Sequence, residues 1–157
     1  MAKKDFQVVV MHGHSKDYLE IKQIILECKF TARIMIEEYA ADTIFENLRN
    51  LIWDDVHCVI VVLTKDDEMK DGSQRARQNV VFELGYCFGA FDSLPNEASY
   101  KSKDALVIIA EKEVELFADI NGLTRIDYET GKLIERKEYI KAVLKESYEK
   151  AKKYYYF

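Results

Sequence analysis

A single carboxylate in an apolar stretch is the residue of this chain best suited to do chemistry. Glu83 stands in the most apolar turn of "QRARQNVVFELGYCFG", residues 74–89, whose spacing predicts a helix from residue 76 to about residue 91 with one buried face. A carboxylate there is costly unless it is paired or used, and partial desolvation would raise its pKa. The alternatives to a working acid are an ion pair with Arg75 or Arg77 and a glutamate at the solvent edge of the helix.

The elements around this helix predict the fold class. Apolar, β-branched runs typical of buried strands occur at residues 6–13, 32–38, 57–64 and 105–110, with a shorter strand near 123–127. Helical patterns alternate with these runs, starting at Ser15 as an N-cap, at residue 42, at residue 76 and at residue 135. Because parallel neighbours need crossover connections, this order predicts an α/β fold with an open parallel sheet of about five strands flanked by helices.

Ligands of such sheets bind beyond the carboxyl ends of the strands, near the point where the strand order reverses. The first loop at that edge is "HGHS", residues 12–15. Gly13 lets the backbone approach a ligand, and the helix that follows offers free N–H groups to a phosphate. A tight turn with His12 and His14 in solvent is the alternative. No metal site is expected, since two histidines lack a third ligand at suitable spacing.

Composition limits the class of protein. The 157 residues, 48% of them apolar, fit one domain spanning residues 1–157, and no apolar run approaches the ~20 residues that cross a membrane. The N-terminus lacks the features of a secretory signal. Three widely spaced cysteines, Cys28, Cys58 and Cys87, indicate buried thiols in a reducing cytoplasm. The net charge is −5, and the basic segment from Lys132 alternates signs at helical spacing, so nucleic-acid binding is not supported.

Four segments carry a family resemblance. "VVVMHGHS", "VIVVLTKDD", "RARQNVVFELGYCFG" and "ADINGLTRIDY" resemble, in order and spacing, the bacterial TIR-like domains described as predicted nucleotide-binding proteins. The resemblance covers roughly residues 6–145. Such domains act as effectors beside cyclic-nucleotide sensors, including STING-type receptors, in anti-phage defence. The resemblance implies a flavodoxin-like TIR fold and NAD+ glycohydrolase activity, with NAD+ as substrate and no other cofactor.

The resemblance implies a role for Glu83, and the NAD+ substrate that it implies suggests roles for the residues around it. Glu83 is the expected catalytic residue and contacts the hydroxyls of the nicotinamide ribose, while Asn79 orients the carboxylate or contacts the ribose. The remaining expected contacts to the substrate, mainly to its pyrophosphate, are His12, Gly13, His14, Ser15, Thr43 and Arg77. Tyr39 or Trp53 could stack on nicotinamide, although an aromatic residue in an apolar segment is more often part of the core. One departure from the family is the loop "EEYAADT", residues 37–43, which is short and lacks glycine.

The chemistry fits a chain with one well-placed acid. Most glycosidases need a second carboxylate to protonate the leaving group, whereas nicotinamide departs as a neutral ring. Family members assemble head to tail, so self-association and a cyclic-nucleotide sensor are the expected partners. Two other functions stay open: a nucleoside deoxyribosyltransferase-like enzyme, which "FELGY" fits locally, and a non-catalytic TIR interaction module. The sequence does not distinguish hydrolysis to ADP-ribose from cyclisation.

Overall fold

The main sheet of the protein has five parallel strands. The computed structural model describes residues 5–35, 46–50, 56–92, 103–116, 120 and 122–154. Within them the strand order is β2-β1-β3-β6-β8. The strands are β1 (Gln7–Met11), β2 (Thr31–Ile34), β3 (Cys58–Leu63), β6 (Leu106–Glu111) and β8 (Thr124–Tyr128). The predicted open parallel α/β sheet is confirmed, in the order of flavodoxin-like folds.

The central strands are buried on both faces. Every residue of β3 and β6 is buried, and the two strands pair in parallel with Val61 opposite Ile108. β1 lies on the other side of β3, with Val10 opposite Ile60. Continuous Val and Ile runs suit this environment, because helices cover both faces of a parallel sheet and no face is left for polar side chains.

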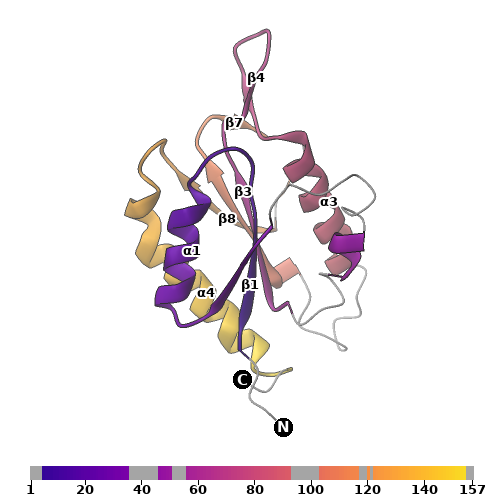
Figure 1. The fold of residues 1–157 in the computed structure, drawn as a ribbon, viewed down its shortest axis with the longest axis vertical. Coiled ribbons are helices and arrows are strands. Elements are labelled where there is room, and N and C mark those ends of the chain that lie inside the picture. Colours follow the sequence, from indigo (N-terminus) through magenta and orange to yellow (C-terminus); the bar gives the residue numbers. More distant parts are fainter. Residues whose placement is uncertain are drawn as a thin grey trace.

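Helices form the two outer layers (Figure 1). α1 (Tyr18–Glu27) and α4 (Lys137–Ala151) cover one face, and α3 (Gln78–Asp92) lies on the other face together with the helical residues 46–50. Two short 3-10 helices, η1 (Lys103–Ala105) and η2 (Leu133–Arg136), precede β6 and α4. Glu27 joins α1 to α4 by accepting from Lys137 and Lys141, each at 2.7 Å.

A second, small sheet was not predicted. β4 (Asp67–Glu68) and β5 (Gln74–Arg75) form a hairpin that projects from the carboxyl edge of the main sheet, and β7 (Val114–Glu115) pairs with β5 (Figure 1). These strands are two residues long and mostly exposed, so they carry no apolar alternation that a sequence reading could detect.

Three predicted helix starts were two residues too early. The last of them is α4, which begins at Lys137 rather than at residue 135. α1 begins at Tyr18 with Asp17 at the N-cap position rather than Ser15. Ser15 instead accepts a hydrogen bond from the N–H of Asp17 at 3.2 Å, so its hydroxyl stabilises the turn before the helix. The helix expected from Ala76 begins at Gln78, because Ala76 and Arg77 are used in the connection from β5.

The predicted thiols are free cysteines. Cys58 and Cys87 are buried as predicted, whereas the prediction is wrong for Cys28, which is half-buried at the C-terminal end of α1. Desolvation raises the pKa of Cys58 and of Cys87 to about 12. Among the residues that the structure describes, no helix has the length and apolar character needed to cross a membrane.

Candidate active site

The strand order places two loops side by side at the carboxyl edge of the sheet. β1 is paired with β2 on one side and with β3 on the other, so the order of the sheet reverses between β1 and β3. A crevice at such a reversal is where open α/β sheets bind ligands. The loop after β1 is "HGHS", and the connection after β3 leads through the β4-β5 hairpin to α3.

Glu83 is buried on α3 and keeps one oxygen without a partner. Its side chain is 6% exposed, and its Oε2 accepts no hydrogen bond within the described chain. Burial raises the pKa of Glu83 to about 7, and the charge of Arg77 opposes part of that rise. The solvent-edge interpretation of Glu83 is therefore wrong. A buried carboxylate oxygen without a hydrogen-bond partner is costly, and a buried acid with a raised pKa is a candidate for a functional site.

The face of α3 that carries Glu83 points toward the end of β1. Cys87 lies one turn after Glu83 on the same face, and its Sγ is 3.9 Å from the Sδ of Met11. Met11 is the last residue of β1 and directly precedes His12. Packing of Cys87 on Met11 thus fixes this face of α3 against the end of β1, one helical turn from Glu83. The negative charge of Glu83 contributes to the raised pKa of Cys87, after desolvation.

The two arginines near Glu83 have different positions. Arg75 binds Glu115 of β7 through two hydrogen bonds, of 2.7 Å from Nε and 3.1 Å from a terminal nitrogen. It therefore does not supply the ion pair that the sequence left open for Glu83. Arg77 is half-buried and lies immediately before α3, and its charge acts on Glu83. Asn79 is exposed in the first turn of α3.

The "HGHS" loop makes contacts within itself and with α1. The Nδ1 of His12 lies 2.8 Å from the carbonyl oxygen of Gly13, which assigns the proton to Nδ1 because a carbonyl only accepts. The His12 ring stacks on Tyr18 with 3.8 Å between ring centroids. Its Nε2 is buried without a hydrogen-bond partner in the described chain. His14 is exposed and Ser15 is half-buried.

Asp66 is the residue that sequence reasoning missed. Its Oδ1 accepts from the backbone N–H of His14 at 3.1 Å and from the hydroxyl of Thr64 at 2.8 Å. Its Oδ2 accepts from the backbone N–H of Arg77 at 3.1 Å. Asp66 thus joins two of the predicted site residues. The only signal in the sequence was an acidic loop, "KDDE", directly after the strongest strand.

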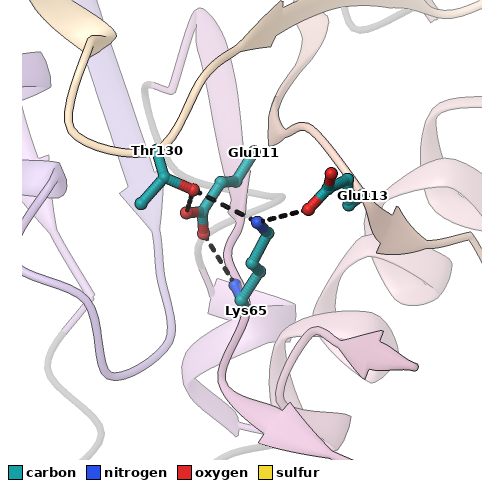
Figure 2. A network of polar contacts seen from close by, with 4 residues as sticks. All are labelled: Lys65, Glu111, Glu113 and Thr130. Carbon is teal, nitrogen blue, oxygen red and sulfur yellow. Dashed lines mark hydrogen bonds and ion pairs between the residues drawn. The ribbon is translucent and has the colours of Figure 1, made fainter. Parts of the chain in front are cut away.

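A second buried carboxylate at the same edge is fully engaged (Figure 2). Glu111, at the end of β6, is 7% exposed. Its Oε2 accepts the backbone N–H of Lys65 at 2.9 Å, and its Oε1 accepts the hydroxyl of Thr130. The Nζ of Lys65 in turn contacts Glu113 at 2.9 Å and Thr130 at 3.2 Å. This network fastens the loops after β3, β6 and β8 to one another.

The far strand is tied to the first helix. Tyr128, the last residue of β8, is fully buried and donates its hydroxyl to Asp17 at 2.6 Å. Burial, the bond to Asp17 and the nearby carboxylates raise the pKa of Tyr128. Because Asp17 precedes α1, this bond fixes the point at which the "HGHS" loop enters its helix.

A cavity of about 400 Å³ adjoins the start of α3. Its lining is Arg75, Ala76, Gln78, Val81, Glu115 and Leu116. Glu83 does not line it, since residues 78 and 83 of a helix point in different directions. We place the centre of the candidate site at Glu83, because its Oε2 is buried without a hydrogen-bond partner in the described chain. Thr43, Tyr39 and Trp53 lie outside the described residues.

Comparison with known proteins identifies the family. The family model of the CAP12/Pycsar effector protein TIR domain matches residues 7–130. The chain belongs to this family. The match runs from β1 past the end of β8 and includes Asp66 and Glu83, so the recognised resemblance is confirmed and the five-stranded sheet is a TIR fold. The TIR domain is an effector domain of the bacterial anti-phage type.

One relative among curated proteins matches the chain at low identity. The TIR domain is 26% identical over 138 residues to the uncharacterized protein YuaY of Escherichia coli strain K12. The alignment covers 80% of the TIR domain and 41% of YuaY, so the chain spans less than half the length of this relative.

Proposed function

We propose that this chain is a cytoplasmic NAD+ glycohydrolase in which Glu83 is the catalytic residue. The observation that carries the proposal is the Glu83 carboxylate, which is buried on α3 with one oxygen that has no hydrogen-bond partner in the described chain. A ribose hydroxyl is a suitable donor to that oxygen. Membership of the TIR effector family supports the same substrate.

The proposed reaction needs only one acid. The bond between the ribose C1′ and the nicotinamide nitrogen breaks, and its electron pair stays on that nitrogen, so nicotinamide leaves neutral and without a proton. Positive charge develops at the ribose, and the fixed negative charge of Glu83 stabilises it. Water then adds to C1′ and releases a proton, giving ADP-ribose. Attack by a nitrogen of the adenine ring instead would give a cyclic product.

The remaining predicted contacts belong to two segments at the carboxyl edge of the sheet. Arg77 and Asn79 lie at the start of α3, and His12, Gly13, His14 and Ser15 form the neighbouring loop. In the proposed complex these residues bind the ribose and the pyrophosphate, with Thr43 as a further contact. We also propose that head-to-tail self-association completes the site and that a cyclic-nucleotide sensor triggers it.

The test is nicotinamide release from NAD+ by the wild-type protein and by Glu83→Gln, both in assembled form. Release that disappears in the variant, with assembly intact, supports the proposal. Parallel incubation with deoxynucleosides separates the deoxyribosyltransferase-like alternative, because free base without nicotinamide would replace the proposal with that enzyme. Normal assembly without NAD+ consumption by the wild type would favour a TIR interaction module.

A further inference from the structure

Asp66 lies where the two loops of the switch point meet. It is half-buried in the connection after β3. Its carboxylate accepts three hydrogen bonds, from the His14 N–H, the Thr64 hydroxyl and the Arg77 N–H. His14 is 52 residues away in the chain and Arg77 is 11 residues away. One carboxylate therefore holds together the loop after β1 and the start of α3.

Gly13 makes this contact sterically feasible. A Cβ at position 13 would lie 1.9 Å from the Oδ2 of Asp66, far inside any allowed contact between non-bonded atoms. The small size of Gly13 thus lets the Asp66 carboxylate lie where it accepts its three hydrogen bonds. The sequence interpretation assigned its small size to the approach of a ligand, and the structure gives it a second reason.

Asp66 also accepts from backbone N–H groups of the kind that bind anions. The N–H groups of a loop and of the residue before a helix are ready-made sites for a phosphate. Here the His14 N–H and the Arg77 N–H both point at Asp66. The Asp66 carboxylate thus takes the place of a bound anion at these two N–H groups. It holds the two backbone segments together without a substrate.

The link continues along α3 to Glu83. The Arg77 carbonyl accepts the first helical bond, from the Val81 N–H at 3.2 Å, so the position of Arg77 sets the first turn. Glu83 lies six residues further on, about 9 Å along the axis. The side-chain charge of Arg77 also acts on Glu83. A shift of Arg77 would therefore change both the placement of Glu83 and its electrostatic surroundings.

We propose that Asp66 is a positioning residue of the active site, which sets Glu83 against the "HGHS" loop by holding His14 and Arg77 together. This inference rests on the proposed function for its catalytic consequence. Asp66 touches no substrate in this scheme. It acts through the backbone of the two segments that carry the contacts.

Asp66→Asn tests the link, with Asp67→Asn as the matched control on the exposed neighbouring residue. An asparagine keeps the size of the side chain, but its amide NH2 cannot accept from a backbone N–H, so one of the two segments loses its partner. We expect kcat for nicotinamide release to fall about 10- to 100-fold with KM little changed, as for a displaced catalytic group. Asp67→Asn should keep the wild-type kcat. A wild-type kcat in Asp66→Asn, below its melting temperature, would overturn the proposal.

Gly13→Ala provides an independent arm through a double-mutant cycle. Alone, it should lower kcat as Asp66→Asn does, because the new Cβ displaces the carboxylate. Combined with Asp66→Ala, it should add little to the loss, since the Cβ then has room, and the two effects are non-additive. Effects that simply multiply would contradict the proposed contact. If Asp66→Asn does not fold, the comparison of Thr64→Val with Thr64→Ser replaces it. Serine keeps the hydroxyl that binds Asp66 and should retain kcat, whereas valine removes it and should lower kcat. Equal kcat values in the two variants would overturn the proposal.

Titration of Glu83 gives a readout that does not need activity. Carbon-13 NMR of the Glu83 carboxyl should show a higher midpoint in Asp66→Asn than in Asp67→Asn, because both variants lose one negative charge and only the first lets Arg77 move away. If the assembled wild-type protein releases no nicotinamide, the proposed function fails, and this titration alone then decides the role of Asp66. A midpoint equal to that in Asp67→Asn would overturn it and a higher midpoint would support it.

Discussion

Two glutamates at the carboxyl edge of the sheet have almost the same burial and different surroundings. Glu83 on α3 is 6% exposed and Glu111 at the end of β6 is 7% exposed. Glu111 accepts from the Lys65 backbone and the Thr130 hydroxyl. The Oε2 of Glu83 accepts from nothing in the described chain. Burial therefore does not distinguish the two glutamates.

The two glutamates differ in the hydrogen bonds that their carboxylates accept. Each hydrogen bond to a buried charge offsets part of its desolvation, and an unmade bond leaves that cost in the folded state. Glu111 uses its bonds to fasten three loops to one another. Glu83 retains an accepting oxygen that a ligand can use. The first arrangement serves stability, and the second lowers it, as the proposed function of Glu83 would require.

The largest expected effect separates the two residues by activity. Glu83→Gln should reduce nicotinamide release on the order of 10³-fold, since it removes the charge that stabilises the transition state. Glu111→Gln, measured well below its melting temperature, should keep activity close to the wild type. The measurement is kcat for nicotinamide release by both variants in the same assembly. Equal losses of kcat in the two variants would show that the two carboxylates do not differ in function.

The pH dependence of stability should carry the signature of Glu83. Its pKa is about 7 in the folded protein against an ordinary value of 4.5, so between these values the folded state binds more protons than the unfolded state. Stability then falls as the pH rises from about 4.5 to about 7, by at most about 3 kcal/mol from this group. Denaturant unfolding of wild type and Glu83→Gln at pH 5 and pH 8 measures it. The variant should exceed the wild type in stability at pH 8 and gain little at pH 5.

Glu111 should show the opposite change in stability. Glu111→Ala removes the acceptor of two hydrogen bonds and leaves the Lys65 N–H and the Thr130 hydroxyl to find other partners. A loss of about 2 kcal/mol in the free energy of unfolding is expected. Denaturant melts against Glu113→Ala provide the control, because Glu113 is 80% exposed in its ion pair with Lys65. If Glu113→Ala is as destabilised as Glu111→Ala, the loss of stability does not come from the buried hydrogen bonds of Glu111.

The smallest effect concerns the charge beside Glu83. Arg77→Met removes the positive charge that lowers the pKa of Glu83, while the backbone N–H that binds Asp66 stays. If the ionised carboxylate is the active form, activity of the wild type rises with pH through about 7, and in the variant this rise moves to higher pH. The profile of kcat against pH is the measurement. Activity that falls over this range would indicate that the protonated acid works instead.

The strands and the catalytic candidate were within reach of the sequence. Runs such as β3 and β6 are continuous Val, Ile and Leu, which only a sheet covered on both faces accommodates. Glu83 was conspicuous because a charge in an apolar helix turn breaks the pattern around it. The small β4-β5-β7 sheet was not predictable, since its two-residue strands form only where the ends of β3 and β6 bring their loops together.

Asp66 shows where sequence reasoning stops. Within "KDDE", nothing in residue type distinguishes Asp66 from Asp67, yet one is half-buried with three donors and the other is exposed. The sequence by itself determined the alternation of strands and helices and the anomaly at Glu83, because both are local patterns of hydrophobicity. Only the tertiary structure decided which carboxylates are satisfied, because a hydrogen-bond partner 52 or 46 residues away is set by strand order rather than by neighbours in the chain.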